Sequence, residues 1–172
     1  MECHLSVDVG VAREGVRRDA ASWDDVYRRV RPALVRALAV ATGSYDQVED
    51  AIQDAFADAI TKAPPDLLSP EGWLYAVALN KLRRYHGRNS LMRRLRLAVP
   101  RPSNDLDQAL FRADLTRVLL KLSPRDRELL VAKHYVGMTQ EEIARHMRIP
   151  RGTVSAAISR AVAHLRDLEA KP

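Results

Sequence analysis

The stretch TQEEIARHMRIPRGTVSAAISRAVAHLRDL, residues 139–168, predicts two short amphipathic helices joined by a turn. Thr139 can cap the first helix, and Glu142 follows three positions later, which is the spacing of a capping box. Pro150 favours the end of one helix and the start of the next. We expect Gly152 to permit tight packing at the start of the second helix. The whole pattern predicts a helix-turn-helix.

The second of these helices has an outward face of unusually small side chains. Its apolar stripe consists of Val154, Ile158, Ala161 and Leu165. Its outward face carries Ser155, Ala156, Ser159, Arg160, Ala163 and Arg166. Small side chains let a helix backbone approach the major groove, where serine reads base edges and alanine contacts thymine methyls. Helical hairpins with polar faces are also ordinary packing units, but the capped start and the basic flank favour DNA binding.

The composition agrees with a basic globular protein. The chain has 172 residues, 47% of them apolar, which allows one or two small domains and excludes disorder throughout. Its net charge of +6 suits nucleic acid, although acidic lipids or an acidic protein remain open as partners. No apolar run approaches the roughly 20 residues that span a bilayer, and no signal-peptide core begins the chain. We therefore expect a cytoplasmic protein without membrane insertion.

The sequence offers little for catalysis or metal binding. Cys3 is the only cysteine, which excludes an intrachain disulfide and a cysteine-rich zinc site. The histidines are scattered, and neither a glycine-rich phosphate loop nor a paired-carboxylate pattern occurs. We expect no enzyme activity, no metal and no cofactor.

Every recognisable element along the chain is helical, with no strand alternation and no fixed repeat. Apolar spacing predicts helices over residues 23–42, 45–60, 71–86, 106–122 and 125–135, besides the helix-turn-helix. Pro32 either kinks the first helix or starts a second one. The segment VPRPSN, residues 99–104, reads as a flexible interdomain linker. We predict an all-α chain of two small helical domains, 22–98 and 105–172, after an extension of residues 1–21.

The helix at residues 45–60 is expected to have one apolar and one acidic side. The apolar side consists of Val48, Ile52, Ala55, Phe56, Ala59 and Ile60. Five acids and no basic residue lie from Asp46 to Asp58. Most acidic helix faces are simply solvated, but the separation of these acids from the arginines further along also suits docking on a basic protein surface. The residues leave both readings open.

The helix at residues 71–86 changes from apolar to basic along its length. Its segment WLYAVAL should be buried, so Trp73 and Tyr75 are expected in the core. Asn80 can read a base edge, arginines can neutralise phosphates, and Tyr85 can stack on an unpaired base. No acidic residue occurs between Gly72 and Asn104.

Three motifs in this order resemble the extracytoplasmic-function (ECF) class of bacterial sigma factors in the sigma-70 family, the small type with only regions two and four. YDQVEDAIQDAFADA is similar to the helix that docks on core RNA polymerase, and WLYAVALNKLRR to the promoter-melting helix. LSPRDRELL through GTVSAAISRAVAHLR is similar to region four. The resemblance implies an alternative sigma factor that binds core RNA polymerase and promoter DNA, with an anti-sigma factor as a further expected partner.

The resemblance also implies roles for matching positions. Core polymerase would meet Asp46, Glu49, Asp50, Gln53 and Asp54. The minus-ten element would meet Asn80, Lys81, Arg83, Arg84, Tyr85 and Arg88. The minus-thirty-five element would meet Arg148, Arg151, Thr153, Ser155, Ala156, Ser159 and Arg160. The family usually has serine in place of Pro150 and basic residues near Ser155 and Ala157, so we expect a weaker phosphate grip here. A stand-alone helix-turn-helix regulator and a helical adaptor that binds only protein are the alternative functions.

Overall fold

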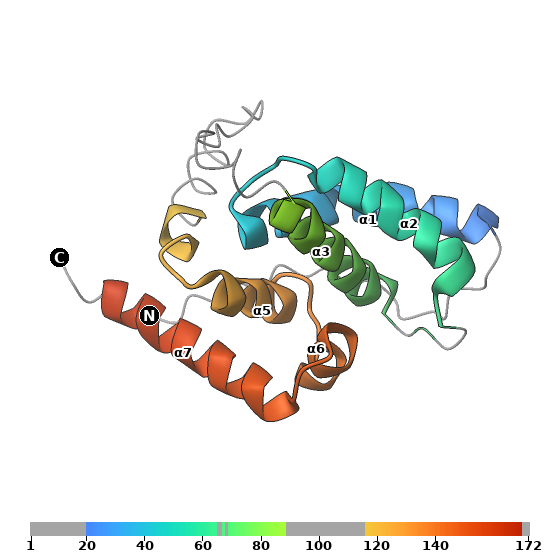
Figure 1. The fold of residues 1–172 in the computed structure, drawn as a ribbon. Helices are drawn as coiled ribbons and strands as arrows, with labels where there is room; N and C mark the ends of the chain where they lie inside the picture. Colours follow the sequence, from blue (N-terminus) through green and yellow to red (C-terminus); the bar gives the residue numbers. More distant parts are fainter. Residues whose placement is uncertain (1–19, 65–66, 68, 89–115, 170–172) are drawn as a thin grey trace.

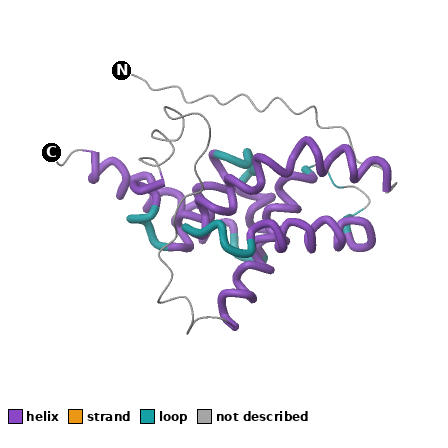
Figure 2. The backbone as a smooth tube through the Cα atoms, turned by 90° about the horizontal axis from the view of Figure 1, so that it is seen from above, coloured by secondary structure: helices purple, strands orange, loops and turns teal. Residues whose placement is uncertain are grey.

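The computed structural model describes residues 20–64, 67, 69–88 and 116–169 (Figure 1). The helices labelled in Figure 1 are α1 Ala20–Thr42, α2 Val48–Lys62, α3 Pro70–Arg88, α5 Pro124–His134, α6 Gln140–Met147 and α7 Arg151–Glu169. These residues include no strand, and the tube in Figure 2 is helix and loop throughout its described length. The all-α prediction is confirmed. The predicted linker 99–104 and nearly all of the predicted extension 1–21 lie outside the described residues.

Helix α1 runs through Pro32 without a break, so the alternative of a second helix starting there is wrong. Pro32 lies on the exposed side of the helix. Water can therefore satisfy the carbonyl that loses its N–H partner to the proline ring. Gly43 ends the helix with a φ of 74°, and its N–H donates to the carbonyl of Ala39 at 2.8 Å.

Helix α2 begins at Val48 rather than at Tyr45, because Gln47 adopts a left-handed conformation with a φ of 62°. Its buried residues are Val48, Ala51, Ile52, Ala55, Phe56 and Ala59. Ile60 is 51% exposed, which contradicts its predicted place on the apolar side. Each step of four residues rotates a position by about 40° around a helix. After three such steps from Val48, Ile60 has left the buried stripe, and Ala51 occupies it instead.

The helices form two groups that pack together. Helices α1, α2 and α3 contact one another, as do α5, α6 and α7. The two groups meet where α5 packs on α1 and where α6 packs on α3. Buried residues of both groups belong to one continuous hydrophobic cluster.

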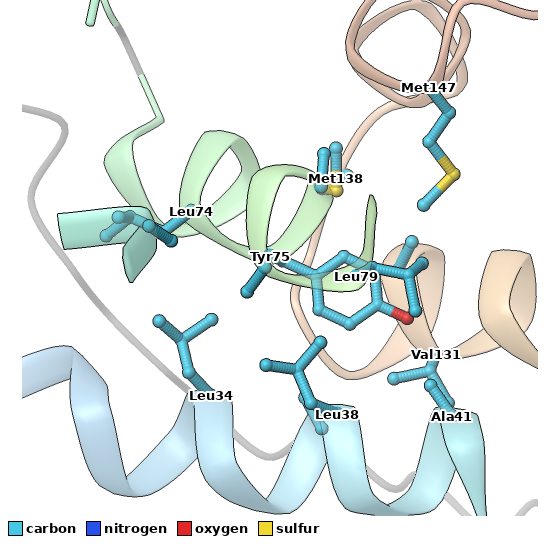
Figure 3. Close-up of a cluster of buried hydrophobic side chains, with 14 of the residues drawn as sticks. Leu34, Leu38, Ala41, Leu74, Tyr75, Leu79, Val131, Met138 and Met147 are labelled. Carbon is cyan, nitrogen blue, oxygen red and sulfur yellow. The ribbon is translucent and has the colours of Figure 1, made fainter. Parts of the chain in front are cut away.

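Tyr75 of α3 lies at the junction of the two groups (Figure 3). Around it, the close-up labels side chains of α1, α3, α5 and α6 and of the loop before α6: Leu34, Leu38, Ala41, Leu74, Leu79, Val131, Met138 and Met147. The Tyr75 side chain is fully buried, as the sequence predicts, and its hydroxyl donates to the backbone carbonyl of Glu128 at 3.0 Å.

Two glycines of the first group allow this close approach. A Cβ on Gly72 would lie 3.0 Å from Cγ of Met138. A Cβ on Gly43 would lie 2.7 Å from Cδ2 of Leu120. Both contacts are closer than side chains tolerate without movement. The absence of a side chain at these positions lets the group of α5, α6 and α7 pack closely on the group of α1, α2 and α3.

Candidate functional site

The helix-turn-helix forms as the sequence predicts. The Thr139 hydroxyl accepts a hydrogen bond from the backbone N–H of Glu142 at 3.1 Å, and the Glu142 carboxylate accepts one from the backbone N–H of Thr139 at 2.7 Å. This is the reciprocal capping box. Arg148 caps the other end of α6 in the left-handed conformation, with a φ of 54°. Because α7 starts three residues later, the two helices are held in a fixed angle around a short turn.

The expectation for Gly152 is wrong. A Cβ built at this position meets nothing within 4 Å, and the residue is exposed. Gly152 faces open space at the surface, so no close packing requires a glycine there.

The predicted minus-thirty-five residues lie together on the outer side of α7 and the preceding turn. Those that are exposed are Arg148, Arg151, Thr153, Ala156, Ser159 and Arg160, whereas Ser155 is half-buried. The opposite side buries Val154, Ala157, Ile158 and Ala161, and Leu165 packs against the core from a half-buried position. Two of the arginines contact acids at the edges of the surface: Arg151 pairs with Glu141, and Arg160 with Asp126, each at 3.0 Å. The middle of the surface therefore carries small side chains between cationic ends.

The predicted polymerase-docking residues lie on α2 and the turn before it. Asp46, Asp50, Gln53 and Asp54 are exposed. Glu49 differs, because its carboxylate is held by Arg31 of α1 through contacts of 2.7 and 3.1 Å. The structure thus brings four of the five predicted residues to an open surface and ties the fifth to a neighbouring helix.

The predicted minus-ten residues lie along the second half of α3, and several contact carboxylates. Lys81 pairs with Asp58 at 2.8 Å, and the Tyr85 hydroxyl donates to Asp54. Arg83 donates to Glu128, while its Nη1 lies 3.3 Å from Oδ1 of the half-buried Asn80. Arg84 is exposed, and the Arg88 side chain lies outside the described residues. The sequence pattern identified these cations but not their acidic partners.

Asp58 and Tyr85 titrate away from their ordinary values because of these contacts. Hydrogen bonds from Lys62, at 2.6 Å, and from Lys81 lower the pKa of Asp58. The hydrogen bond to Asp54 raises the pKa of Tyr85, since the ionised carboxylate opposes loss of the phenolic proton. Asp58 stays charged and anchors Lys81 beside the acidic surface of α2.

Two charged residues of α5 are buried, which no sequence signal indicated. Arg127 and Glu128 are 5% and 7% exposed. Nε of Arg127 donates to the carbonyl of Ala41 at 2.8 Å, and burial lowers the pKa of its guanidinium. An Arg-Glu pair in a short helix ordinarily faces water. Here both side chains lie between the two groups of helices.

Within the described residues, no cluster of histidine, cysteine and carboxylate side chains is arranged to hold a metal ion. Among the same residues, no helix combines the length and the apolar character needed to cross a membrane.

Comparison with known families identifies both groups of helices. Residues 26–91 match Sigma-70 region 2, and residues 112–165 match Sigma-70, region 4. The chain belongs to the sigma-70 family. Helices α1, α2 and α3 are its region 2, and α5, α6 and α7 are its region 4. The sigma factor is of the ECF class and directs promoter-specific transcription.

Individual relatives agree with this assignment. The sigma factor is 28% identical to RNA polymerase sigma factor NccH of Alcaligenes xylosoxydans xylosoxydans, over 95% of each chain. It is 25% identical to ECF RNA polymerase sigma factor SigM of Mycobacterium tuberculosis, over 96% of this chain and 86% of that protein.

Solved structures show the same fold. CnrH, in complex with the cytosolic domain of CnrY, matches the sigma factor with a TM-score of 0.66 and 27% identity, over 90% of this chain and 92% of that one. RpoE of Bartonella quintana, in complex with the anti-sigma factor NepR, matches with a TM-score of 0.65 and 21% identity, over 87% and 98%.

Proposed function

We propose that this sigma factor docks on core RNA polymerase through α2, reads the minus-ten element with α3 and reads the minus-thirty-five element with α7. The observation that carries the proposal is the separation of charge among exposed helix faces. Asp46, Asp50, Gln53 and Asp54 gather on α2 and the turn before it, while the cations predicted to contact DNA belong to α3, to α7 and to the turn before α7. Opposite charges on separate faces allow one molecule to bind a basic protein and an acidic nucleic acid together.

On α7, the arrangement supports binding in the major groove. Its exposed Ala156 and Ser159 leave room for the helix backbone, and the exposed Arg151 and Arg160 offer cations of the kind that contact phosphates beside the groove. Few cations face outward from the middle of the helix. We infer that α7 sets the register on DNA and supplies only part of the affinity.

On α3, the arrangement supports capture of an unpaired base. Asn80 offers an amide beside Arg83, whose Nη1 lies 3.3 Å from its Oδ1. Extruding a base costs a few kcal/mol, which a pocket and phosphate contacts must offset. Arg84 supplies an exposed cation for those contacts, and Arg83 and Lys81 supply two more once they are released from Glu128 and Asp58.

Partners and location follow the same reasoning. CnrH is solved with the cytosolic domain of CnrY, and we infer that an anti-sigma factor also binds this chain. The sigma factor would act in the cytoplasm, where polymerase and chromosome meet. We assign it no catalytic residue, because its contribution to transcription is binding and DNA opening.

Reconstitution with purified core RNA polymerase tests the proposal. Core polymerase plus the full chain should give transcripts from a double-stranded promoter template that core polymerase alone does not give. Duplex binding without polymerase-dependent transcription would instead indicate a stand-alone helix-turn-helix regulator. Binding to neither DNA nor polymerase would leave a helical adaptor.

A further inference from the structure

The contact between region 2 and region 4 uses a side chain that the proposed function needs for DNA. Arg83 of α3 directs Nε and Nη2 toward the two carboxylate oxygens of Glu128 on α5, and the Nε to Oε1 distance is 3.3 Å. The Arg83 and Glu128 side chains are 34% and 10% exposed. The pair is therefore largely shielded from water, where a charge pair is screened less than at the surface.

The geometry of this pair is the one that arginine uses for phosphate. The Nε–Nη2 edge of a guanidinium holds carboxylate and phosphate groups alike, through two parallel N–H donors. While Glu128 occupies that edge, the Nε and Nη2 donors of Arg83 are not available to a DNA phosphate.

Further contacts fix the same arrangement around Glu128. The backbone carbonyl of Glu128 accepts the hydroxyl of the fully buried Tyr75, and the neighbouring Arg127 donates to Ala41. At the edge of the interface, Nε of Arg36 lies 3.0 Å from the Tyr135 hydroxyl. Each of these bonds joins region 2 to region 4, so loss of one buried partner would leave the other unsatisfied.

The packed arrangement is too small to bind both promoter elements at once. Elements centred about 25 base pairs apart are separated by roughly 85 Å of B-DNA, at about 3.4 Å for each step. A compact chain of this length has a radius of gyration of about 16 Å. Regions 2 and 4 must separate before α3 and α7 reach their two elements together.

We propose that Glu128 is an internal substitute for a DNA phosphate, which holds Arg83 and keeps region 4 closed on region 2 in the free chain. Promoter binding then requires this contact to open, because Arg83 cannot hold Glu128 and a DNA phosphate with the same edge of its guanidinium. The inference rests on the proposed function for its consequence in transcription. The closed form of the free chain can be tested without polymerase.

The first test measures closure directly in the free chain. Donor and acceptor dyes are attached at Thr61→Cys on α2 and Ala163→Cys on α7, both exposed positions, in a Cys3→Ser background. Glu128→Gln should move a population of molecules from high to low energy transfer, with the open-to-closed ratio rising roughly tenfold. Asp25→Asn, which removes a charge from an exposed site on α1, is the matched control and should leave the ratio unchanged. Identical transfer in Glu128→Gln and the parent chain would overturn the proposal.

The second test locks the interface and measures transcription. Gly72→Cys with Met138→Cys, again with Cys3→Ser, places two thiols where a Gly72 Cβ would meet the Met138 side chain. The oxidised chain should lose at least about tenfold of its promoter-dependent transcription, and reductant should restore it. The Met138→Cys single variant in the same Cys3→Ser background, treated identically, is the control, because it leaves Gly72 unchanged and cannot form the disulfide. Equal transcription from oxidised and reduced forms would overturn the requirement for opening.

The two failures are distinguishable. An unmodified chain that gives no promoter-dependent transcription with core polymerase contradicts the proposed function. Normal transcription by the unmodified chain, together with unchanged energy transfer in Glu128→Gln, contradicts only the role of Glu128.

Discussion

Among single residues, Asn80 is the one whose chemistry distinguishes base recognition from simple charge neutralisation. Its side chain is half-buried, and its Oδ1 lies within hydrogen-bonding distance of Arg83. An amide offers both a donor and an acceptor to a base edge, which a lysine or arginine does not. Removal of the Asn80 amide should therefore reduce the opening of promoter DNA more than it reduces binding to core polymerase.

Asn80→Ala should reduce open-complex formation roughly tenfold, equivalent to about one hydrogen bond, with little change in affinity for core polymerase. Permanganate reactivity of unpaired thymines measures the first quantity, and co-purification with core polymerase measures the second. An equal loss of both would remove Asn80 from the proposed base pocket.

Asp58 allows a prediction of pH dependence. Its pKa in the folded chain is lowered by Lys62 and Lys81, so the ionised carboxylate stabilises the fold above the pKa of the unfolded chain. That stabilisation is lost as pH falls through the folded pKa. Asp58→Asn should lower the free energy of unfolding by up to about 1 kcal/mol near neutral pH. The difference from the unmodified chain should shrink below about pH 4 in urea titrations; a difference that does not vary with pH would contradict the charge pairing.

At the scale of the helix, α6 depends on its cap. It has eight residues, Gln140–Met147, which is short for a helix to persist without tertiary and capping contacts. The reciprocal bonds of Thr139 and Glu142 satisfy two backbone donors at its start.

Thr139→Ala should lower the free energy of unfolding by about 1 kcal/mol, and Thr139→Ser should retain most of it because the hydroxyl remains. Thermal or urea unfolding of the two variants checks this. Equal stability of Thr139→Ala and Thr139→Ser would show that the capping box contributes nothing in the folded chain.

Helix α2 offers a second prediction at this scale, for protein binding. Asp50 is one of the exposed acidic residues of α2, and its charge can be reversed without changing the buried side of the helix. Asp50→Lys should weaken association with core polymerase about fivefold or more, which corresponds to about 1 kcal/mol. Asp25→Lys makes the same charge change at an exposed position of α1 and should leave the association with core polymerase unchanged. Unchanged association of Asp50→Lys would mean that the α2 acids are only solvated.

At the scale of the whole molecule, the sequence predicted the helices and their buried sides well because helical periodicity is a local property. The capping box, the α7 stripe and the burial of most of the WLYAVAL segment, in which Trp73 and Val77 are only half-buried, follow from residues a few positions apart. The errors at Ile60 and Gly152 have the same local origin. A stripe drifts around the helix, and a glycine does not reveal whether anything packs beside it.

Contacts between regions were beyond such reasoning. Periodicity indicates which side of a helix is buried but not which partner covers it, and Tyr75 meets Glu128 across 53 positions of sequence. The acidic partners of Lys81, Arg83 and Tyr85 were missed for the same reason. Their cationic or aromatic character is visible in the sequence, whereas the three carboxylates that hold them come from two other helices.

Mapping of transcript start sites on genomic DNA tests the central claim most directly. Core RNA polymerase supplemented with this chain should start at sites absent with core polymerase alone. Those sites should share two sequence elements at a fixed spacing, one recognised through α3 and the other through α7. Start sites identical to those of core polymerase alone would contradict the account.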